Sequence, residues 1–339
     1  MMKRPTIADV AAAAGVSTAT VSKAVNGRYG VAADTAEMVR RVADELGYGS
    51  SLGASSMRSG RTGVVGVFVA AFEPWATEVL KGVGVGLQST PYDLLAYSGS
   101  YQSDHDGWER RSLSRLSGTL VDGAIVVAPS TTDLRVSVPV VAIDPSKGPA
   151  GLPTVEADSF GGARMAVRRL LELGHRRIGF VSGRPDLRSA ALREAGYRRA
   201  LEDAGLPFDP ALVRMGAYEQ RASREAASAL LDLPEPPTAI FAGNDLSALA
   251  TLQAARVRGV DVPADLSVIG FDDVPEAARS DPPLTTVQQA MQRMGAAAAA
   301  MLLDLLDGRE PQEGHQVLGT RLVERQTTAP PRAMLRRAT

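Results

Sequence analysis

The sequence predicts an α/β protein whose body consists of parallel β-sheets flanked by helices, preceded by a small all-α domain. From residue 63 onward, short apolar segments typical of buried strands alternate with amphipathic segments. Before residue 49, apolar residues recur at helical spacing in three short runs. Between them, residues 49–62 are rich in glycine and serine, as in a linker. We therefore divide the chain of 339 residues into 1–48, 49–62 and 63–339.

The composition argues against several kinds of site. The chain is 45% hydrophobic and has no cysteine, which excludes disulfides and thiolate chemistry and suits a reducing cytosol. Its histidines, at positions 105, 175 and 315, are too far apart for helical metal-ligand spacing, so we expect neither a metal nor a cofactor. No apolar run reaches the ~20 residues that span a membrane, and the N-terminus lacks the apolar core of an export signal. We expect a cytoplasmic protein without membrane contact.

Charge is distributed unevenly along the chain. The formal net charge is −1, but residues 1–61 contain eight Lys or Arg and five acidic residues, which gives +3. The rest of the chain then carries −4. A basic N-terminal part on a slightly acidic body favours a nucleic acid as the partner of the N-terminal part.

The first two helical segments are short and are joined by a tight turn. Thr6 lies three residues before Asp9, a capping pattern at the start of the first helix, and Gly15 ends that helix. Ser17 can cap the second helix, which extends to about Val25. On the outward face of the second helix we expect short or polar side chains, namely Thr18, Ala19, Ser22 and Lys23.

A third helix, at roughly residues 32–46, completes this domain. It supplies apolar residues to the predicted core, namely Met38, Val39, Val42 and Leu46. Two short helices with a tight turn, closed by a third, describe a helix-turn-helix, whose second helix fits the major groove of DNA. The alternative is a small helical bundle with an ordinary solvated face.

The body alternates strands with helices. Strand candidates lie at 64–69, 93–97, 123–128, 138–143, 177–182, 239–242 and 266–271. Amphipathic segments lie near 76–88, 105–117, 160–173, 190–204, 222–232 and 246–258. The Ala-rich stretch before residues 301–303 predicts one more packed helix. Such parallel sheets bind ligands at the carboxyl ends of their strands.

Polar side chains follow several of the predicted strands. Asp144, Asn244 and Asp272 come directly after strands, and Arg193 lies early in a helix that follows another. Carboxylates accept hydroxyl protons while Arg and Asn donate, which suits a ligand rich in hydroxyl groups. Aromatic residues that could stack on such a ligand are Phe72, Trp75, Phe160 and Tyr218. The alternative is that Asp and Asn after a strand only cap the next helix.

Two groups of segments closely resemble the LacI/GalR family of bacterial regulators. In the N-terminal part they are residues 6–11, 14–23, 26–27 and 45–48. In the body they are residues 172–180, 242–245, 268–274 and 283–287. The resemblance implies a DNA-binding transcription regulator that is not an enzyme. It also implies a body of two doubly wound lobes, similar to periplasmic sugar-binding proteins.

The resemblance assigns roles to residues of the N-terminal part. The residues that would face the bases are Thr18, Ala19 and Lys23, and those that would hold phosphates are Thr6, Ser17, Thr20, Ser22, Asn26 and Tyr48. In the family the linker folds into a short helix on DNA and enters the minor groove, here with Ala54 and Met57. The family usually has Arg at the position of Lys23, and Lys lacks the rigid fork with which Arg binds guanine.

The resemblance also divides the body. The first lobe would comprise about 63–158 and 289–320, and the second about 159–288 and 321–330. Matching the family's effector contacts are Asp158, Arg193, Tyr218, Asn244 and Asp272, to which we add Glu73, Trp75 and Asp144 from the first lobe. The C-terminal tail lacks the leucine heptads of tetrameric relatives, so we expect a homodimer.

These features predict a ligand-responsive repressor of carbohydrate-utilisation genes, released from a palindromic operator in double-stranded DNA by a sugar. The alternative is a regulator that needs a non-sugar metabolite as co-repressor. A sugar-binding receptor would need an export signal and no helix-turn-helix. An α/β enzyme is disfavoured because the chain has no dinucleotide fingerprint, Walker loop or nucleophile elbow.

Overall fold

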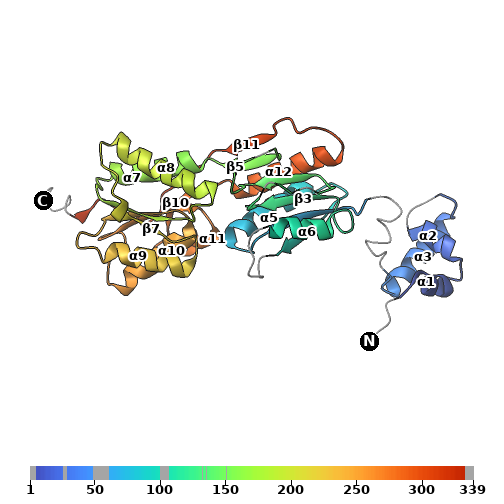
Figure 1. Ribbon diagram of the computed structural model, residues 1–339. Helices are drawn as coiled ribbons and strands as arrows, with labels where there is room; N and C mark the ends of the chain where they lie inside the picture. The colour runs from blue at the N-terminus through green and yellow to red at the C-terminus, as the bar shows by residue number, and fades with distance from the viewer. Residues whose placement is uncertain are drawn as a thin grey trace. The chain divides into compact units, whose positions relative to one another are not determined.

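A computed structural model describes residues 5–25, 29–48, 61–99, 107–131, 133–134, 136–149 and 151–332. The chain divides into two compact units, Met1–Thr62 and Gly63–Thr339, which we call the N-terminal unit and the body (Figure 1). Three residues with predicted roles on DNA, Asn26, Ala54 and Met57, lie outside the described residues.

The N-terminal unit consists of three helices, α1 (Ile7–Ala14), α2 (Thr18–Val25) and α3 (Ala33–Glu45). Its core is small and is formed by Val10, Ala11, Val21, Ala24, Val39 and Ala43. The three predicted helices are confirmed. Leu46, which we expected in this core, is instead 41% exposed. The reason is that α3 ends at Glu45, so that Leu46 belongs to the turn beyond the helix.

The body contains two six-stranded sheets. The first has the order β11-β5-β4-β3-β1-β2, and the second has the order β12-β10-β9-β8-β6-β7. In the first sheet the strands are β1 (Val64–Val69), β2 (Asp93–Ser98), β3 (Gly123–Val127), β4 (Val140–Ile143), β5 (Thr154–Ala157) and β11 (His315–Leu318). In the second they are β6 (Ile178–Ser182), β7 (Val213–Met215), β8 (Ala239–Ala242), β9 (Ser267–Asp272), β10 (Thr285–Gln288) and β12 (Arg321–Val323). Between these strands every pairing is parallel except that of β10 with β12.

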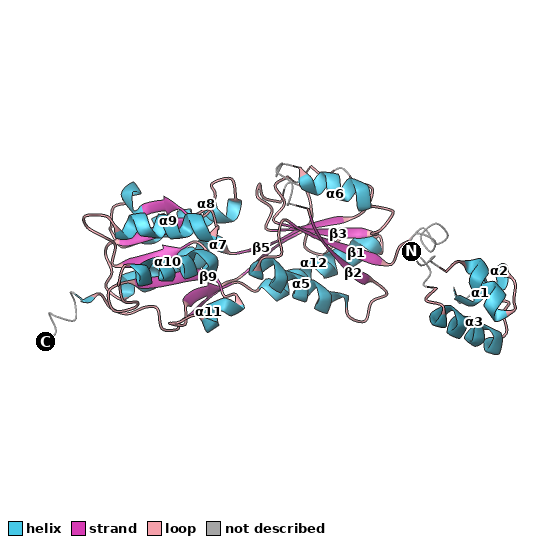
Figure 2. Cartoon of the chain, turned by 90° about the horizontal axis from the view of Figure 1, so that it is seen from below, coloured by secondary structure: helices cyan, strands magenta, loops and turns pink. Residues whose placement is uncertain are grey.

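Helices cover both faces of each sheet, as predicted. With the first sheet they form what we call the first lobe, and they are α5 (Pro74–Leu87), α6 (Trp108–Leu116) and α12 (Met291–Leu306). Figure 2 shows α5 and α12 on one face of this sheet and α6 on the other. The second lobe contains α7 (Ser159–Glu172), α8 (Arg188–Asp203), α9 (Gln220–Leu231), α10 (Asp245–Val257) and α11 (Pro275–Arg279).

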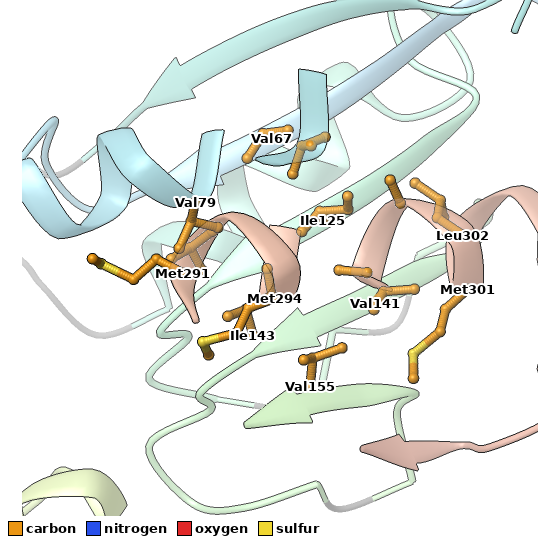
Figure 3. Close-up of a cluster of buried hydrophobic side chains, with 14 of the residues drawn as sticks. Val67, Val79, Ile125, Val141, Ile143, Val155, Met291, Met294, Met301 and Leu302 are labelled. Atoms are coloured by element: carbon orange, nitrogen blue, oxygen red, sulfur yellow. The ribbon is translucent and has the colours of Figure 1, made fainter. Parts of the chain in front are cut away.

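The core of the first lobe joins segments that are far apart in the sequence. Strand residues such as Ile125, Val141 and Ile143 face Met294 and Leu302 of α12, and all five are buried (Figure 3). Burying each such side chain contributes roughly 1.5–3 kcal/mol. In this way the helix that follows the second lobe is tied to the first. Its close packing on α5 requires Gly82 and Gly295, because a Cβ at either position would collide with the opposite backbone.

The chain crosses between the lobes at the ends of three strands. It leaves the first lobe after β5 and again after β11, and it leaves the second lobe after β10. Since each of these strands ends where the chain enters the other lobe, the carboxyl ends of the two parallel sheets face one another. This is the sheet edge at which α/β folds bind ligands. Among the described residues, no helix is both long and apolar enough to cross a membrane.

Candidate nucleic-acid interface and ligand site

The exposed face of α2 carries the residues predicted to read bases. Thr18, Ala19 and Lys23 are exposed, whereas Val21 and Ala24 on the opposite face are buried. Ser17 Oγ accepts a hydrogen bond from the Thr20 backbone N–H at 3.0 Å and so caps the helix. Helix α2 therefore presents short side chains and one flexible cation on a single surface, as contact with base edges requires.

Two predicted phosphate ligands also hold the helix ends. The hydroxyls of Ser17 and Thr20 lie 2.9 Å apart and share one hydrogen bond, so one of the two protons remains for a phosphate oxygen. The Thr6 hydroxyl donates to the Asp9 carboxylate at 2.6 Å, and the Thr6 backbone N–H donates to the same oxygen at 2.7 Å. Thr6 can donate its hydroxyl proton to a phosphate only after releasing Asp9.

The other described phosphate candidates are less exposed. Ser22 is half-buried on α2, and Tyr48 is half-buried against the core of the N-terminal unit. Tyr48 follows α3 and donates its backbone N–H to the Ala43 carbonyl at 2.8 Å. Packing therefore fixes the position from which the Tyr48 hydroxyl could reach DNA.

In the body, Arg193 is the centre of a buried polar cluster. Only 4% of this residue is exposed, and its guanidinium lies 3.8 Å from the centre of the Phe271 ring. It donates to the Gly243 carbonyl at 2.5 Å and lies 3.5 Å from the Asp272 carboxylate. A buried guanidinium is stable only with such partners. Arg193 is therefore held at the edge where β8 and β9 end.

Asp272, the last residue of β9, is bonded on a second side. Gln289 donates its side-chain amide to the Asp272 carboxylate at 2.6 Å. Burial raises the pKa of Asp272 to about 6, which Arg193 and Gln289 oppose and Glu73 of the first lobe reinforces. The Asp272 carboxylate thus has the Arg193 guanidinium and the Gln289 amide as partners, and the negatively charged Glu73 of the first lobe lies close enough to affect its pKa.

Asp144 brings a carboxyl group of the first lobe to the same cluster. It follows β4 and accepts a hydrogen bond from the Ala157 backbone N–H at 3.2 Å. Burial raises the pKa of Asp144 to about 7, and the nearby Arg193 guanidinium opposes this rise. Near neutral pH such a group can either donate or accept a hydrogen bond.

Two aromatic side chains in the described ranges have buried polar atoms without a partner, Tyr218 beside Arg193 and Trp75 in the first turn of α5. Within the described chain, the buried Tyr218 hydroxyl and the buried Trp75 indole N–H have no hydrogen-bond partner. Burial raises the pKa of Tyr218, so its hydroxyl keeps its proton as a donor. Arg193 lies 5.6 Å from the centre of the Tyr218 ring. Buried polar atoms are nearly always paired in folded proteins, so each of these unpaired donors indicates a position for a ligand or a water molecule.

Strained backbone marks the same sheet edges. Among described non-glycine residues, positive φ occurs at the carboxyl ends of strands at Ala128, Asp144, Ala217, Tyr218, Asp272 and Asp273. Each such residue costs on the order of 1–3 kcal/mol and persists only where the surrounding structure imposes it. Three of them belong to the polar cluster, so the fold stabilises an unfavourable backbone in order to aim these side chains.

The remaining predicted ligand residues have other partners. Asp158 Oδ1 accepts from the Gly161 backbone N–H at 2.8 Å, and Asn244 Oδ1 accepts from Ser247 at 2.9 Å. Both therefore cap the helices that follow them, which is the alternative we considered for residues after strands. Glu73 stands before α5 with an exposed side chain; partial desolvation and Glu219 of the second lobe raise its pKa.

Sequence reasoning missed three residues of the cluster. Gln289 is 2% exposed, and it follows the short strand β10, which we did not predict. Ser159 accepts from the Arg193 Nε at 3.4 Å from the start of α7. Asp245, fully buried below the cluster, accepts from Thr286 at 2.5 Å. Recognising Thr285–Gln288 as a strand would have placed Gln289 at its carboxyl end.

The two lobes are in contact at this edge. Arg188 of the second lobe lies 3.2 Å from the Glu156 carboxylate of the first, and its backbone N–H donates to the Ser146 carbonyl at 3.0 Å. The cavity beside Asp144 measures about 10 Å³, which is room for at most one water molecule. The space beside Asp144 is therefore too small for a sugar ring.

The comparisons with known proteins agree with this architecture. Residues 6–51 match the model of bacterial regulatory proteins of the lacI family, and residues 167–328 match that of a periplasmic binding protein-like domain. The transcriptional regulator CelR of Thermobifida fusca is 34% identical over 343 residues, covering 96% of this chain and 98% of CelR. The transcriptional repressor CytR of Escherichia coli K12 is 32% identical over 330 residues, covering 95% and 96%.

Solved structures show the same likeness. The complex of CelR with cellobiose superimposes with a TM-score of 0.71 at 34% identity, covering 96% of this chain and all of that one. The lac repressor dimer bound to operator and the anti-inducer ONPF gives a TM-score of 0.82 at 27% identity, with the same coverage. The resemblance inferred from the sequence is confirmed: the chain belongs to the lacI family of bacterial regulatory proteins, which are DNA-binding regulators of transcription and not enzymes.

Proposed function

We propose that this chain represses carbohydrate-utilisation genes as a cytoplasmic homodimer and that a sugar bound between its lobes releases it from a palindromic operator. The observation that carries the proposal is the cluster of Arg193, Asp272 and Asp144 at the facing ends of the two sheets. It draws on both lobes, so a ligand that bridges the cluster couples to their relative position.

The chemistry of the cluster favours a hydroxyl-rich ligand. Two carboxyl groups accept hydroxyl protons, while Arg193, Tyr218 and the Trp75 indole donate. The aromatic faces of Tyr218 and Trp75 can pack against the apolar face of a sugar ring. CelR, whose complex with cellobiose has a similar fold, supports the choice of a sugar.

The N-terminal unit supplies the DNA contacts. We assign base contact to Thr18, Ala19 and Lys23. We assign phosphate contact to Thr6, Ser17, Thr20, Ser22, Asn26 and Tyr48. One such unit makes few contacts, whereas two at fixed spacing read the two halves of a palindrome. A sugar that changes the lobe arrangement would alter that spacing. Coupling of this kind typically changes affinity about 5- to 150-fold.

The experiment is an operator titration of the full chain with and without sugars. An operator is first selected from random double-stranded DNA, and its binding is followed by fluorescence anisotropy in the presence of cellobiose and a panel of other mono- and disaccharides. We expect at least one sugar to weaken operator binding. If a non-sugar metabolite tightens binding instead, the co-repressor alternative holds. Operator affinity that no compound changes in either direction contradicts ligand control.

A further inference from the structure

A second cavity lies where the chain crosses between the lobes. Its volume is about 500 Å³, which is ample for a small metabolite. It is lined by residues of α5, the ends of β9 and β10, the first turn of α12 and the crossover after β11. The lining includes Glu78, Asp273, Gln288, Gln289, Arg293 and Arg321. Neither Arg193 nor Asp144 lines it, whereas Gln289 belongs both to this cavity and to the cluster described above.

The N-terminus of α12 opens into this cavity without a side-chain cap. Ala290 occupies the N-cap position, and no side chain accepts from the first turn of this 16-residue helix. The first N–H groups of a helix have no intrahelical acceptor, and together with the helix dipole they attract anions. The three residues of that turn, Met291, Gln292 and Arg293, all line the cavity. An anion there would satisfy groups that the protein leaves open.

The charged side chains around the cavity leave a positive excess for a ligand. Both acidic residues are already neutralised: Asp273 lies 2.6 Å from Arg325, and Glu78 lies 2.5 Å from Lys81. Arg293, by contrast, is exposed and has no ion pair among the described residues. Arg321 donates one N–H to Gln288 at 2.6 Å, which leaves most of its donors unused.

Gln289 supplies an independent sign that a ligand belongs here. It lines the cavity, is 2% exposed and has a side-chain oxygen with no hydrogen-bond partner in the described chain. Its amide nitrogen donates one N–H to Asp272 at 2.6 Å, and its oxygen is left as an unused acceptor. That oxygen can accept from a hydroxyl or ammonium group. The same side chain thus connects this cavity to the carboxylate that pairs with Arg193.

We propose that this cavity is a second ligand site, which binds a small anion that carries a hydroxyl or ammonium group. The carboxylate or phosphate binds at the N-terminus of α12 beside Arg293, and the donor turns toward Gln289. Because Gln289 also holds Asp272, occupancy changes the affinity of the cluster for its sugar. This coupling rests on the proposed function, whereas the binding itself does not.

The first test measures binding of D-glycerate and of glycerol 3-phosphate to the full chain by calorimetry, with no sugar or DNA present. The two probes distinguish a carboxylate from a phosphate ester. We expect Arg293→Gln to weaken binding of the preferred anion at least roughly tenfold, as expected for loss of a charge-assisted hydrogen bond. The matched control is Arg110→Gln, an exposed arginine of α6 that has no ion pair among the described residues and should bind like the parent.

A second variant separates binding from folding. Ala290→Asp places a carboxylate at the N-cap of α12, where it satisfies the open N–H groups and repels an anion. It should raise the melting temperature while binding falls at least roughly tenfold. The neutral cap Ala290→Asn should lose less affinity. The proposed site is overturned if the parent and all variants bind the anion with equal affinity. It is also overturned if neither probe gives a heat of binding at concentrations up to about 10 mM.

The coupling is tested last, on the sugar identified by the operator titration. Saturating anion should change the dissociation constant of the sugar by roughly fivefold or more, and the sugar should change that of the anion by the same factor. If the anion binds but both constants are independent of each other, the site stands and its link through Gln289 is wrong.

Discussion

The two candidate sites differ in how far apart in the sequence their partners lie. In the N-terminal unit the hydrogen bonds that set the site join residues three to five apart, as between Thr20 and Ser17 or between Tyr48 and Ala43. In the body, Arg193 and Gly243 are 50 residues apart, and Gln289 and Asp272 are 17 apart. A short window of sequence therefore suffices to build the DNA-contact surface, whereas the ligand site exists only when both lobes have folded.

The two candidate sites also differ in how deeply their side chains are buried. Lys23 and its neighbours on α2 are exposed, so changing them should cost DNA affinity but little folding stability. Arg193 and Asp272 are almost fully buried, at 4% and 5% exposure. Removing either leaves a charge without its partner in a desolvated place. Substitutions in the body should therefore affect both stability and ligand response.

The largest expected effect is that of Arg193→Ala. It removes the cation beside two buried carboxyl groups, and we expect the body to lose about 3–5 kcal/mol of unfolding free energy. The measurement is urea unfolding of the full chain. The control Arg221→Ala removes an arginine that is 86% exposed and pairs with Glu225 on the surface; such a pair contributes at most about 1 kcal/mol. Equal losses in the two variants would show that the cluster around Arg193 is not stabilising.

Asp144→Asn should have a smaller effect that depends on pH. Burial raises the pKa of Asp144 from its ordinary value to about 7, so the folded body retains a proton that the unfolded chain releases at lower pH. The stability from this group is complete below about pH 4 and is lost as the pH rises through about 7.

The variant lacks this titration. The unfolding free energy of the variant minus that of the parent should therefore increase as the pH rises from about 5 to about 8. Asp232→Asn is the control, because the pKa of Asp232 is lowered by Arg258 and the group titrates below this range. A difference between parent and Asp144→Asn that stays constant with pH would contradict the buried position of the carboxyl group.

The sequence predicted those elements that are long or strongly periodic. The seven predicted strands all overlap observed ones, and the structure adds β5, β7, β10, β11 and β12. These five have three or four residues each and contain polar side chains, whereas β4 and β8, which also have four residues, are wholly apolar and were predicted. Because β10 was not predicted, nothing in the sequence indicated that Gln289 lies beside Asp272.

Of the polar residues predicted for the ligand site, some belong to the cluster and others cap helices. The sequence shows that Asp144 and Asp272 follow strands. It shows the same for Asn244, which caps a helix instead. The deciding factor is the direction of the backbone. Asp144 and Asp272 have φ of 46° and 119°, a conformation that long-range packing imposes and that residue type does not reveal.

Lys23→Ala tests the DNA-contact surface of the N-terminal unit. If Lys23 contacts a base, specific operator binding should weaken by about 1–3 kcal/mol, while urea unfolding of the body stays unchanged. Arg41→Ala, on α3, removes the same charge from the N-terminal unit without touching the exposed face of α2. If Arg41→Ala weakens operator binding as much as Lys23→Ala does, the contribution of Lys23 is only its net charge.

The smallest expected effect is that of Ser17→Ala. Loss of the cap that accepts from Thr20 should destabilise α2 by about 1 kcal/mol. Hydrogen exchange in the full chain should then be faster for the amides of α2 and unchanged in the body. Faster exchange that extends into the body would show that the two units do not unfold independently.

The central claim is that one ligand site in the body controls the DNA affinity of the N-terminal unit, and Asp272→Ala tests it most directly. Its operator titration with the sugar that releases the parent should yield the operator affinity of the unliganded parent and no response to the sugar. The control Asp232→Ala removes a surface carboxylate that pairs with Arg258, and it should still respond. If Asp272→Ala is released from the operator by the same sugar at the same concentration as the parent, the account is contradicted.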